Sequence, residues 1–270
     1  MSNVQQLANK NIKISSLIIL LLVLIILSLL AFGWLFFHRV NPVSQYVPKL
    51  MQTSAPPKYL FTVTGSQKDE FKKPMAVVSD SRGYIYVADT GNGVIKSFDS
   101  NGQYVSTIGK DQLRVPFQLT YSGGGIWVAD PGLKKVQVFN TDGTLEQTFV
   151  QSPKNQDPNA KEDLVPTAVA IDSNEVYVAD TASHAVRVYD KKGKELRKIG
   201  HPGNDTGGLS YPNALWVADG KVFVSDTNNA RIQVFDTKGS FLQTIDGKAT
   251  KTGPLTLPRG IAVSSRGQIF

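Results

Sequence analysis

The stretch Val224-Ser-Asp-Thr-Asn-Asn-Ala-Arg-Ile-Gln-Val-Phe235 contains the end of an apolar strand, a tight loop opened by Asp226, and a second strand that alternates in polarity. It belongs to a unit that begins at Pro212 and recurs along the chain. The opening prolines, separated by 42, 50, 46 and 46 residues, are Pro74, Pro116, Pro166, Pro212 and Pro258. The aspartates that end the apolar strand, in Val-Ala-Asp or Val-Ser-Asp, are Asp89, Asp130, Asp180 and Asp226. Spacing this regular indicates internal structural repeats.

Within each repeat the hydrophobic pattern changes from one predicted strand to the next. The second strand, residues 176–179 in one copy, has apolar residues at both odd and even positions. This pattern fits a strand that is buried on both faces of its sheet. The third, residues 186–189, alternates, and the fourth, residues 195–199, is partly polar, as expected of an outer strand. A period in this range without a helical pattern predicts one small sheet per repeat. The predicted fold class is therefore all-β, a β-propeller of four-stranded blades.

Written as a pattern, the repeat reads Pro-x-Ala/Gly-(apolar)-x-x-Asp, then Ile/Val-Tyr/Phe-Val-Ala/Ser-Asp-Thr-x-Asn-x-x-Ile/Val-x-Val-Phe, then Gly. It resembles the NHL repeat, most closely from Pro212 to Gly247. The resemblance covers residues 59–270 in four full copies and one partial copy. It implies a propeller, usually of six blades, and it does not imply one activity.

The sequence stops at Phe270, in the middle of a predicted strand. We therefore expect a propeller that is incomplete at its C-terminus, with four and a half blades visible. Six blades would need roughly 60–70 further residues at this period, whereas five blades would need little more than one further strand. The segment Tyr59–Gly65 reads like an orphan fourth strand, which would complete the blade built by the end of the chain.

The N-terminal part of the chain has a different composition. Residues 14–37 are 24 residues without a charge, long enough at about 1.5 Å per residue to span a bilayer as a helix. The alternative is a cleaved signal peptide, whose apolar region usually runs only about 7–15 residues. We expect a short cytoplasmic tail at 1–13, a transmembrane helix at 14–37 and a Pro-rich stalk at 38–58. The predicted location is the cell membrane, single-pass, with the N-terminus cytoplasmic and the propeller extracytoplasmic.

Charge and cysteine content narrow the classes of partner. The net charge of the chain is +7, but residues 1–58 contain five cations and no acid. The remainder therefore has 29 − 5 = 24 Lys and Arg residues and 22 Asp and Glu residues, a net charge of +2. A propeller of net charge +2 does not support nucleic-acid binding. The absence of cysteine excludes disulfides and zinc sites ligated by cysteine.

The repeated aspartates admit two interpretations. They could form a metal ring, or each could accept hydrogen bonds from backbone N–H groups of the tight loop that follows it. We favour the second, structural loop-capping, because the residues recur with the fold; they are Asp89, Asp130, Asp180 and Asp226. The histidines His184 and His201 do not make a three-ligand zinc site. We expect no metal, no cofactor and no catalytic residue in this chain.

The residues after the opening prolines should line the mouth of the central channel. They are Met75, Phe117, Thr167, Asn213 and Arg259. The gluconolactonase-like calcium propellers resemble this fold, but here only Asn213 is a plausible ligand, and Arg259 would repel a cation. The candidate ligand-binding residues are Gln118, Thr167, Asn213 and Arg259, with a solvated channel lining as the alternative.

Two functions from different classes follow. The first is a membrane-tethered extracytoplasmic binding or sensor module for a protein, peptide or glycan. The second is an enzyme of lyase or lactonase type, with a metal site completed by residues beyond 270. The absence of Gly-x-Ser-x-Gly, a phosphate-binding loop and His-Glu-x-x-His favours the first. The polar insert 152–162 could be a recognition loop or tolerated surface.

Overall fold

The computed structural model describes residues 59, 61–64, 70–160, 162–248, 253–264 and 266–270, which belong to one compact unit, Pro57–Phe270. The predicted tail, transmembrane helix and stalk lie outside the described residues. No helix in the described part of the chain has the length and apolarity needed to span a bilayer.

Four antiparallel sheets of four strands each, here called blades 1 to 4, follow one another along the chain. Blade 1 has β1 (Pro74–Ser79), β2 (Ile85–Asp89), β3 (Val94–Phe98) and β4 (Tyr104–Ile108), and blade 2 has β5 (Gln118–Ser122), β6 (Gly125–Asp130), β7 (Lys135–Asn140) and β8 (Leu145–Gln151). Blade 3 has β9 (Pro166–Asp172), β10 (Glu175–Asp180), β11 (Ala185–Asp190) and β12 (Glu195–Ile199), and blade 4 has β15 (Pro212–Ala218), β16 (Lys221–Asp226), β17 (Arg231–Asp236) and β18 (Phe241–Ile245). The predicted all-β propeller of four-stranded blades is confirmed.

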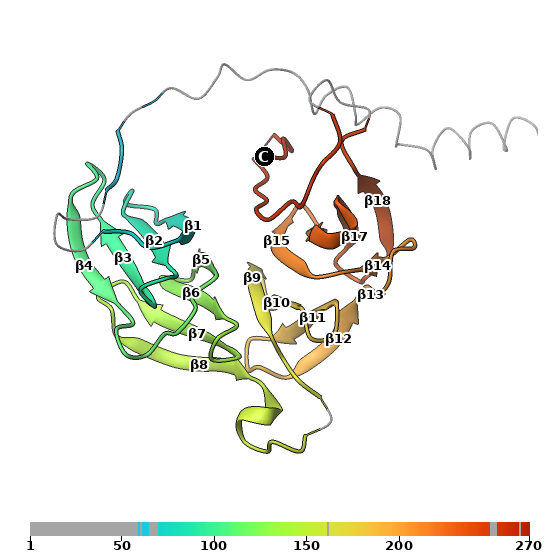
Figure 1. Ribbon diagram of the computed structural model, residues 1–270, viewed down its shortest axis with the longest axis horizontal. Helices are drawn as coiled ribbons and strands as arrows, with labels where there is room; N and C mark the ends of the chain where they lie inside the picture. The colour runs from blue at the N-terminus through green and yellow to red at the C-terminus, as the bar shows by residue number, and fades with distance from the viewer. Residues whose placement is uncertain (1–58, 60, 65–69, 161, 249–252, 265) are drawn as a thin grey trace, which may run out of the picture. The chain divides into compact units, whose positions relative to one another are not determined.

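The blades are arranged with their first strands toward a common centre and their fourth strands at the periphery (Figure 1). The neighbouring inner strands β1, β5, β9 and β15 contact one another in sequence. After blade 4, Val263 bridges Ile269, and Ala262 and Phe270 exchange backbone hydrogen bonds. The described residues of 261–264 and 266–270 thus form a short antiparallel pairing after blade 4, and a propeller of six blades stays a prediction.

Each interface between blades is an apolar layer. Blades 1 and 2 share one buried cluster, blades 2 and 3 a second, and blades 3 and 4 a third. The middle strands are buried on both faces, as the sequence pattern predicted; Tyr177, Val178 and Ala179 of β10 are all at most 1% exposed. Burial of apolar area at these interfaces contributes roughly 25 cal/mol per Å² and holds neighbouring blades together.

The predicted orphan strand is not formed by the described residues of 59–64, which belong to no sheet. This segment lies beside the turn between β3 and β4, since a Cβ on Gly102 would be 2.9 Å from the ring of Phe61. Gly102 has φ of 81°, which an L-residue rarely adopts, so glycine is needed there for the turn as well as for the contact.

Candidate functional site

The aspartate that ends the second strand of each blade is completely buried and binds two segments at once. In blade 3, Asp180 Oδ1 accepts hydrogen bonds from the N–H of Ala182, in the following loop, at 3.0 Å and of Val165, before the opening proline, at 2.9 Å. The N–H groups bound on the proline side in the other blades belong to Lys72 for Asp89, Arg114 and Val115 for Asp130, and Ser210 for Asp226. Each carboxylate also accepts a hydrogen bond from the loop that follows its own strand, so it fastens the segment before the opening proline to that loop.

A basic side chain completes the hydrogen bonding of most of these carboxylates. Asp180 Oδ2 accepts from Arg187 Nε at 2.7 Å, Asp226 Oδ2 from Arg231 Nε at 2.7 Å, and Lys96 Nζ lies 2.9 Å from Asp89 Oδ2. Burial alone would lower the pKa of Arg187, but the hydrogen bond and charge of Asp180 more than offset this and raise it.

These buried carboxylates are engaged with protein donors rather than gathered around a common point. Among the residues that the structure describes, no three His, Asp or Glu side chains are grouped so that they could hold a metal ion. The geometry is that of a hydrogen-bonded clamp between linker and loop.

Two of the four predicted channel-mouth residues bind the next blade. Gln118 Oε1 accepts the N–H of Val169 at 2.7 Å, and Thr167 Oγ1 donates to the carbonyl of Pro212 at 2.6 Å. Thr167 is only 6% exposed. Of the predicted set, Asn213 is half-buried and Arg259 is exposed, so these two keep surface that a ligand could reach.

The two histidines of the propeller act separately. His184 Nδ1 accepts the backbone N–H of Tyr211 at 3.1 Å, and the two rings meet edge to face with centroids 4.9 Å apart. His201 Nε2 lies 3.1 Å from both carboxylate oxygens of Asp205, an exposed pair whose hydrogen bond lowers the pKa of Asp205. His184 has φ of 50°, close to Lys134 at 56° in the same loop of blade 2, so this loop position is left-handed in both blades.

The insert 152–162 is anchored at its base. Ser152, which is completely buried, donates its hydroxyl to Asp163 Oδ1 at 2.5 Å, and Lys134 Nζ lies 2.6 Å from Asp163 Oδ2. Burial would raise the pKa of Asp163, but hydrogen bonds from Lys134, Ser152 and the N–H of Leu164 lower it to about 2. The residues at 157–159 are exposed, so a fixed base presents a solvent-facing tip.

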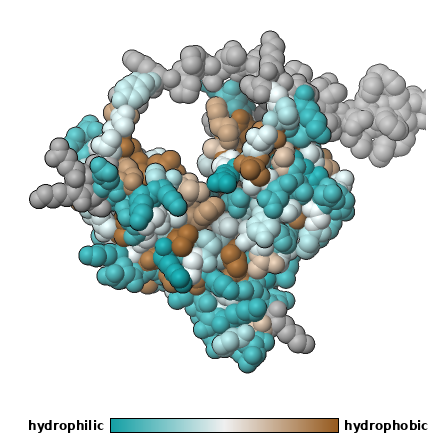
Figure 2. Space-filling view, in the orientation of Figure 1, coloured by the Kyte–Doolittle hydropathy of each residue, from teal (hydrophilic) through white to brown (hydrophobic). Residues whose placement is uncertain are grey.

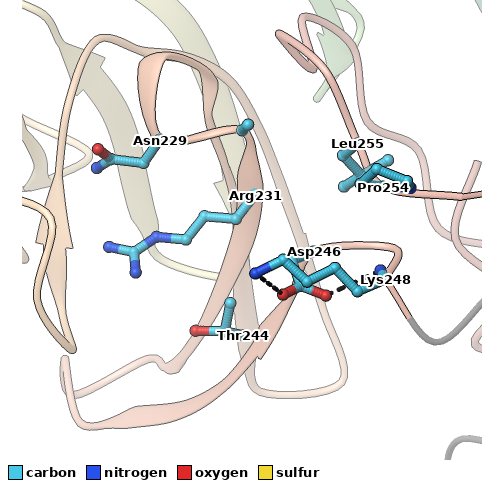
Figure 3. Close-up of a pocket in the computed structure, with 8 residues that line it drawn as sticks. Asn229, Arg231, Thr244, Asp246, Lys248, Pro254 and Leu255 are labelled. Atoms are coloured by element: carbon cyan, nitrogen blue, oxygen red, sulfur yellow. Dashed lines mark hydrogen bonds and ion pairs between the residues drawn. The ribbon is translucent and has the colours of Figure 1, made fainter.

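A pocket that the sequence did not predict lies beside blade 4 (Figure 3). Its volume is about 320 Å³, and its lining combines the loop between β16 and β17, the end of β18 and the outgoing linker. The lining residues are Asn229, Ala230, Arg231, Thr244, Asp246, Lys248, Pro254 and Leu255. Lys248 Nζ lies 3.2 Å from Asp246 Oδ2 in an exposed ion pair. Pro254 and Leu255, which follow blade 4 in the chain, complete the lining of this pocket, and no motif marks it.

The fold and the clamped loops define the class as a β-propeller with one loop face held rigid. Residues 164–189, which include all of β9 and β10 and most of β11, match the family model of the NHL repeat. The match spans one repeat, and together with the four blades it confirms the resemblance to the NHL repeat that the sequence predicted. No curated protein sequence gives a significant match.

Solved structures with the same fold come from different functional classes. The chain is similar to one from a nidogen/laminin complex, with a TM-score of 0.58, 17% identity, and 72% of this chain and 70% of that chain covered. It is similar to a streptogramin B lyase, with a TM-score of 0.56 and 18% identity. That match covers 78% of this chain and 65% of the lyase chain. It is also similar to a catalytically inactive virginiamycin B lyase from Staphylococcus aureus with quinupristin, with a TM-score of 0.52 and 14% identity. That match covers 73% of this chain and 61% of the other. The chain thus spans less than two thirds of the two lyase chains, and at these identities the likeness concerns the fold alone.

Proposed function

We propose that this protein is a membrane-tethered, extracytoplasmic propeller that binds a protein, peptide or glycan through its loop face. The observation that carries the proposal is the set of four buried aspartates, each of which fixes the segment before an opening proline to the loop that follows its own strand. Loops held rigidly on a scaffold lose little conformational entropy when a ligand binds, so they suit recognition. The uncharged segment 14–37 supports the tether.

A lyase or lactonase type of enzyme, with a metal site completed by residues beyond 270, is the second candidate. The likeness in fold to streptogramin B lyase and the pocket beside blade 4 favour it. A lyase or lactonase reaction would require charged or metal-binding groups that point toward a substrate. The buried aspartates do not supply such groups, because they already accept hydrogen bonds from backbone N–H groups. The binding function therefore has the stronger support.

Topology is tested on intact cells that express the full chain. A protease added outside should cleave the exposed turn at Lys191–Lys192, between β11 and β12, or another exposed loop, and leave the N-terminal tail uncleaved. Cleavage only after the cells are permeabilised would contradict extracytoplasmic placement. The reciprocal control is a tag on residues 1–13, which should become accessible only after permeabilisation.

Function is tested on the full chain purified in detergent. Peptide and glycan arrays should give saturable binding, while metal analysis of the same sample should give no stoichiometric metal. Tight stoichiometric metal together with turnover of a lactone or a cyclic depsipeptide, and no array binding, would favour the enzyme instead.

A further inference from the structure

Blade 2 departs from the other blades at two positions next to its buried aspartate. Hydrophilic residues cover much of the rim of the molecule (Figure 2), but the aspartate that ends the second strand of each blade is completely buried. In blades 1, 3 and 4 the residues three and seven positions after it supply side-chain donors to its carboxylate. The donors at the third position are Asn92, Ser183 and Asn229, and those at the seventh are Lys96, Arg187 and Gln233. In blade 2 these positions hold Leu133 and Gln137.

The buried aspartate of blade 2, Asp130, therefore has backbone donors alone. Its carboxylate accepts the N–H of Val115 at 3.1 Å, of Leu133 at 3.0 Å and of Arg114 at 2.7 Å. In the part of the chain that the structure describes, no lysine or arginine forms an ion pair with it, whereas the aspartates of the other three blades each pair with a cation. A buried carboxylate without a positive partner is unfavourable, because burial removes the water that would stabilise its charge.

The side chain of Gln137 is buried beside this carboxylate. Gln137 is only 4% exposed, and its Oε1 has no hydrogen-bond donor among the described residues. It lies opposite Val128 in the register of β6 and β7, so its side chain is on the same face as that of Asp130, two residues further along β6. The equivalent pair of blade 4 is in contact, since Gln233 Nε2 lies 3.3 Å from Asp226 Oδ2. Blade 2 thus brings together two oxygen acceptors that cannot satisfy each other.

In the other blades a cation joins the aspartate to the segment before the opening proline. In blade 1, Lys96 Nζ lies 2.9 Å from Asp89 Oδ2 and 3.2 Å from the carbonyl oxygen of Glu70, four residues before Pro74. A guanidinium forms the same bridge in blades 3 and 4. The residues of these two bridges are Arg187 with Asp180 and the carbonyl of Asp163, and Arg231 with Asp226 and the carbonyl of Gly208. The repeat therefore places one positive charge among oxygen atoms at this point.

We propose that blade 2 binds an alkali-metal cation, K⁺ or Na⁺, at the position that the ammonium group of Lys96 occupies in blade 1. The repeat assigns its oxygen ligands to Asp130, to Oε1 of Gln137 and to a backbone carbonyl of residues 112–113. One carboxylate balances one positive charge, whereas calcium takes about six to eight oxygen ligands and zinc favours His and Cys. The inference goes beyond the proposed binding function and does not depend on it.

Lys135 is the other group that could neutralise Asp130. It lies opposite Asp130 in the register of β6 and β7, at the repeat position of Arg231, whose Nε binds Asp226 in blade 4. Lys135 forms no ion pair with Asp130 among the contacts that the structure describes. The experiment therefore has to separate the ammonium group of Lys135 from a cation in solution.

The first measurement is the Tm of the full chain in detergent, in the chlorides of K⁺, Na⁺ and choline at equal ionic strength. Choline carries the same charge but is too large to replace an ammonium group among buried oxygen atoms. We expect K⁺ or Na⁺ to raise the Tm over choline by about 2–5 °C and to saturate, because a ligand that binds only the folded state stabilises it. Equal Tm values in the three salts would overturn the proposal.

Gln137→Lys supplies the cation from within the chain, as Lys96 does in blade 1. Its Tm in choline should exceed that of the wild type, and the difference between K⁺ and choline should disappear. Gln147→Lys is the matched control, because Gln147 is exposed on β8 of the same blade. It should keep the wild-type response to K⁺. A wild-type response in Gln137→Lys would contradict the assigned position.

Lys135→Gln should also keep the wild-type response to K⁺. If Lys135 instead supplies the charge, the Tm of this variant should fall in choline and a response to K⁺ should appear that the wild type lacks.

Crystals of the full chain soaked in Rb⁺ locate the ion directly, and we expect an anomalous peak between Asp130 and Gln137. An ordered water without anomalous signal, or a Gln137 whose Nε2 donates to Asp130, would overturn the proposal. None of these outcomes bears on the proposed binding function, which the peptide and glycan arrays test separately.

Discussion

The hydroxyl of Thr120, in blade 2, donates a hydrogen bond of 2.6 Å to the carbonyl oxygen of Val169, in blade 3. Gln118, two residues earlier on β5, accepts the N–H of the same valine at 2.7 Å. The N–H and the carbonyl oxygen of Val169 thus both form hydrogen bonds with side chains of blade 2. Near the centre of the propeller, polar side chains join blades that are otherwise held together by apolar packing.

Thr120→Val keeps the shape of the side chain and removes the donor to Val169. The carbonyl would lose a partly buried partner, so we expect a loss of about 1–3 kcal/mol in the free energy of unfolding. Thr148→Val, on the exposed outer strand β8 of the same blade, is the control and should change stability by less than about 0.5 kcal/mol. Urea denaturation of the two variants measures the difference, and equal values would show that the contact does not stabilise the fold.

Val77 and Val169 occupy the same repeat position on the inner strands of blades 1 and 3, but Val77 is 67% exposed and Val169 is completely buried. Val169→Ala removes buried methyl groups from the layer between blades 2 and 3, and should cost roughly 2 kcal/mol. Val77→Ala should change stability by less than about 0.5 kcal/mol. A large effect at Val77 would mean that another surface covers blade 1 in solution.

Asp180→Ala should be strongly destabilising, by about 3–5 kcal/mol, because it leaves Arg187 buried without its carboxylate partner and frees the N–H groups of Val165 and Ala182. Asp190→Ala, in the exposed turn between β11 and β12, is the control and should cost about 1 kcal/mol or less. Calcium or EDTA should leave the wild-type Tm unchanged. A rise in Tm with calcium that Asp180→Ala abolishes would instead indicate a metal ring.

Asp163 predicts how stability depends on acid. Its folded pKa of about 2 lies below the ordinary value of 3.8, so its ionised form stabilises the fold. This contribution, roughly 2 kcal/mol, is fully present above about pH 4 and is lost as the pH falls toward 2. Asp163→Asn should lower stability at pH 7 and flatten this part of the profile, while Asp157→Asn, on the same insert, should preserve the wild-type slope. Urea midpoints between pH 2 and 7 measure both.

The spacing of prolines and aspartates was enough to predict the blades, because each residue performs the same local task in every copy. Asp180, for example, ends a strand and accepts the N–H of a residue shortly before the opening proline, as its counterparts in the other blades do, so the sequence periodicity carries the geometry. Strand burial was likewise readable from residues 176–179, whose unbroken apolarity matches a strand covered on both faces.

The candidate site was less predictable, since its residues act across blades. Spacing placed Gln118 and Thr167 near the channel, but it could not reveal that the backbone of Val169 and Pro212 would occupy their polar atoms. The exposed Tyr211 and the pocket at Asp246 depend on how linkers pass between blades. The segments between blades differ in length, and the left-handed φ of Tyr211 has no signature in its residue type.

Because a buried carboxylate binds the backbone just before the opening proline of each of the four blades, the direction in which the inner strand starts does not depend on the path taken to reach it. The route from β8 to β9 includes the insert 152–162, whereas the route from β4 to β5 is short, yet both arrive at an equivalent anchor. Segments between blades are therefore free to lengthen or change over evolutionary time, and new surfaces can arise there without disturbing the radial symmetry of the sheets.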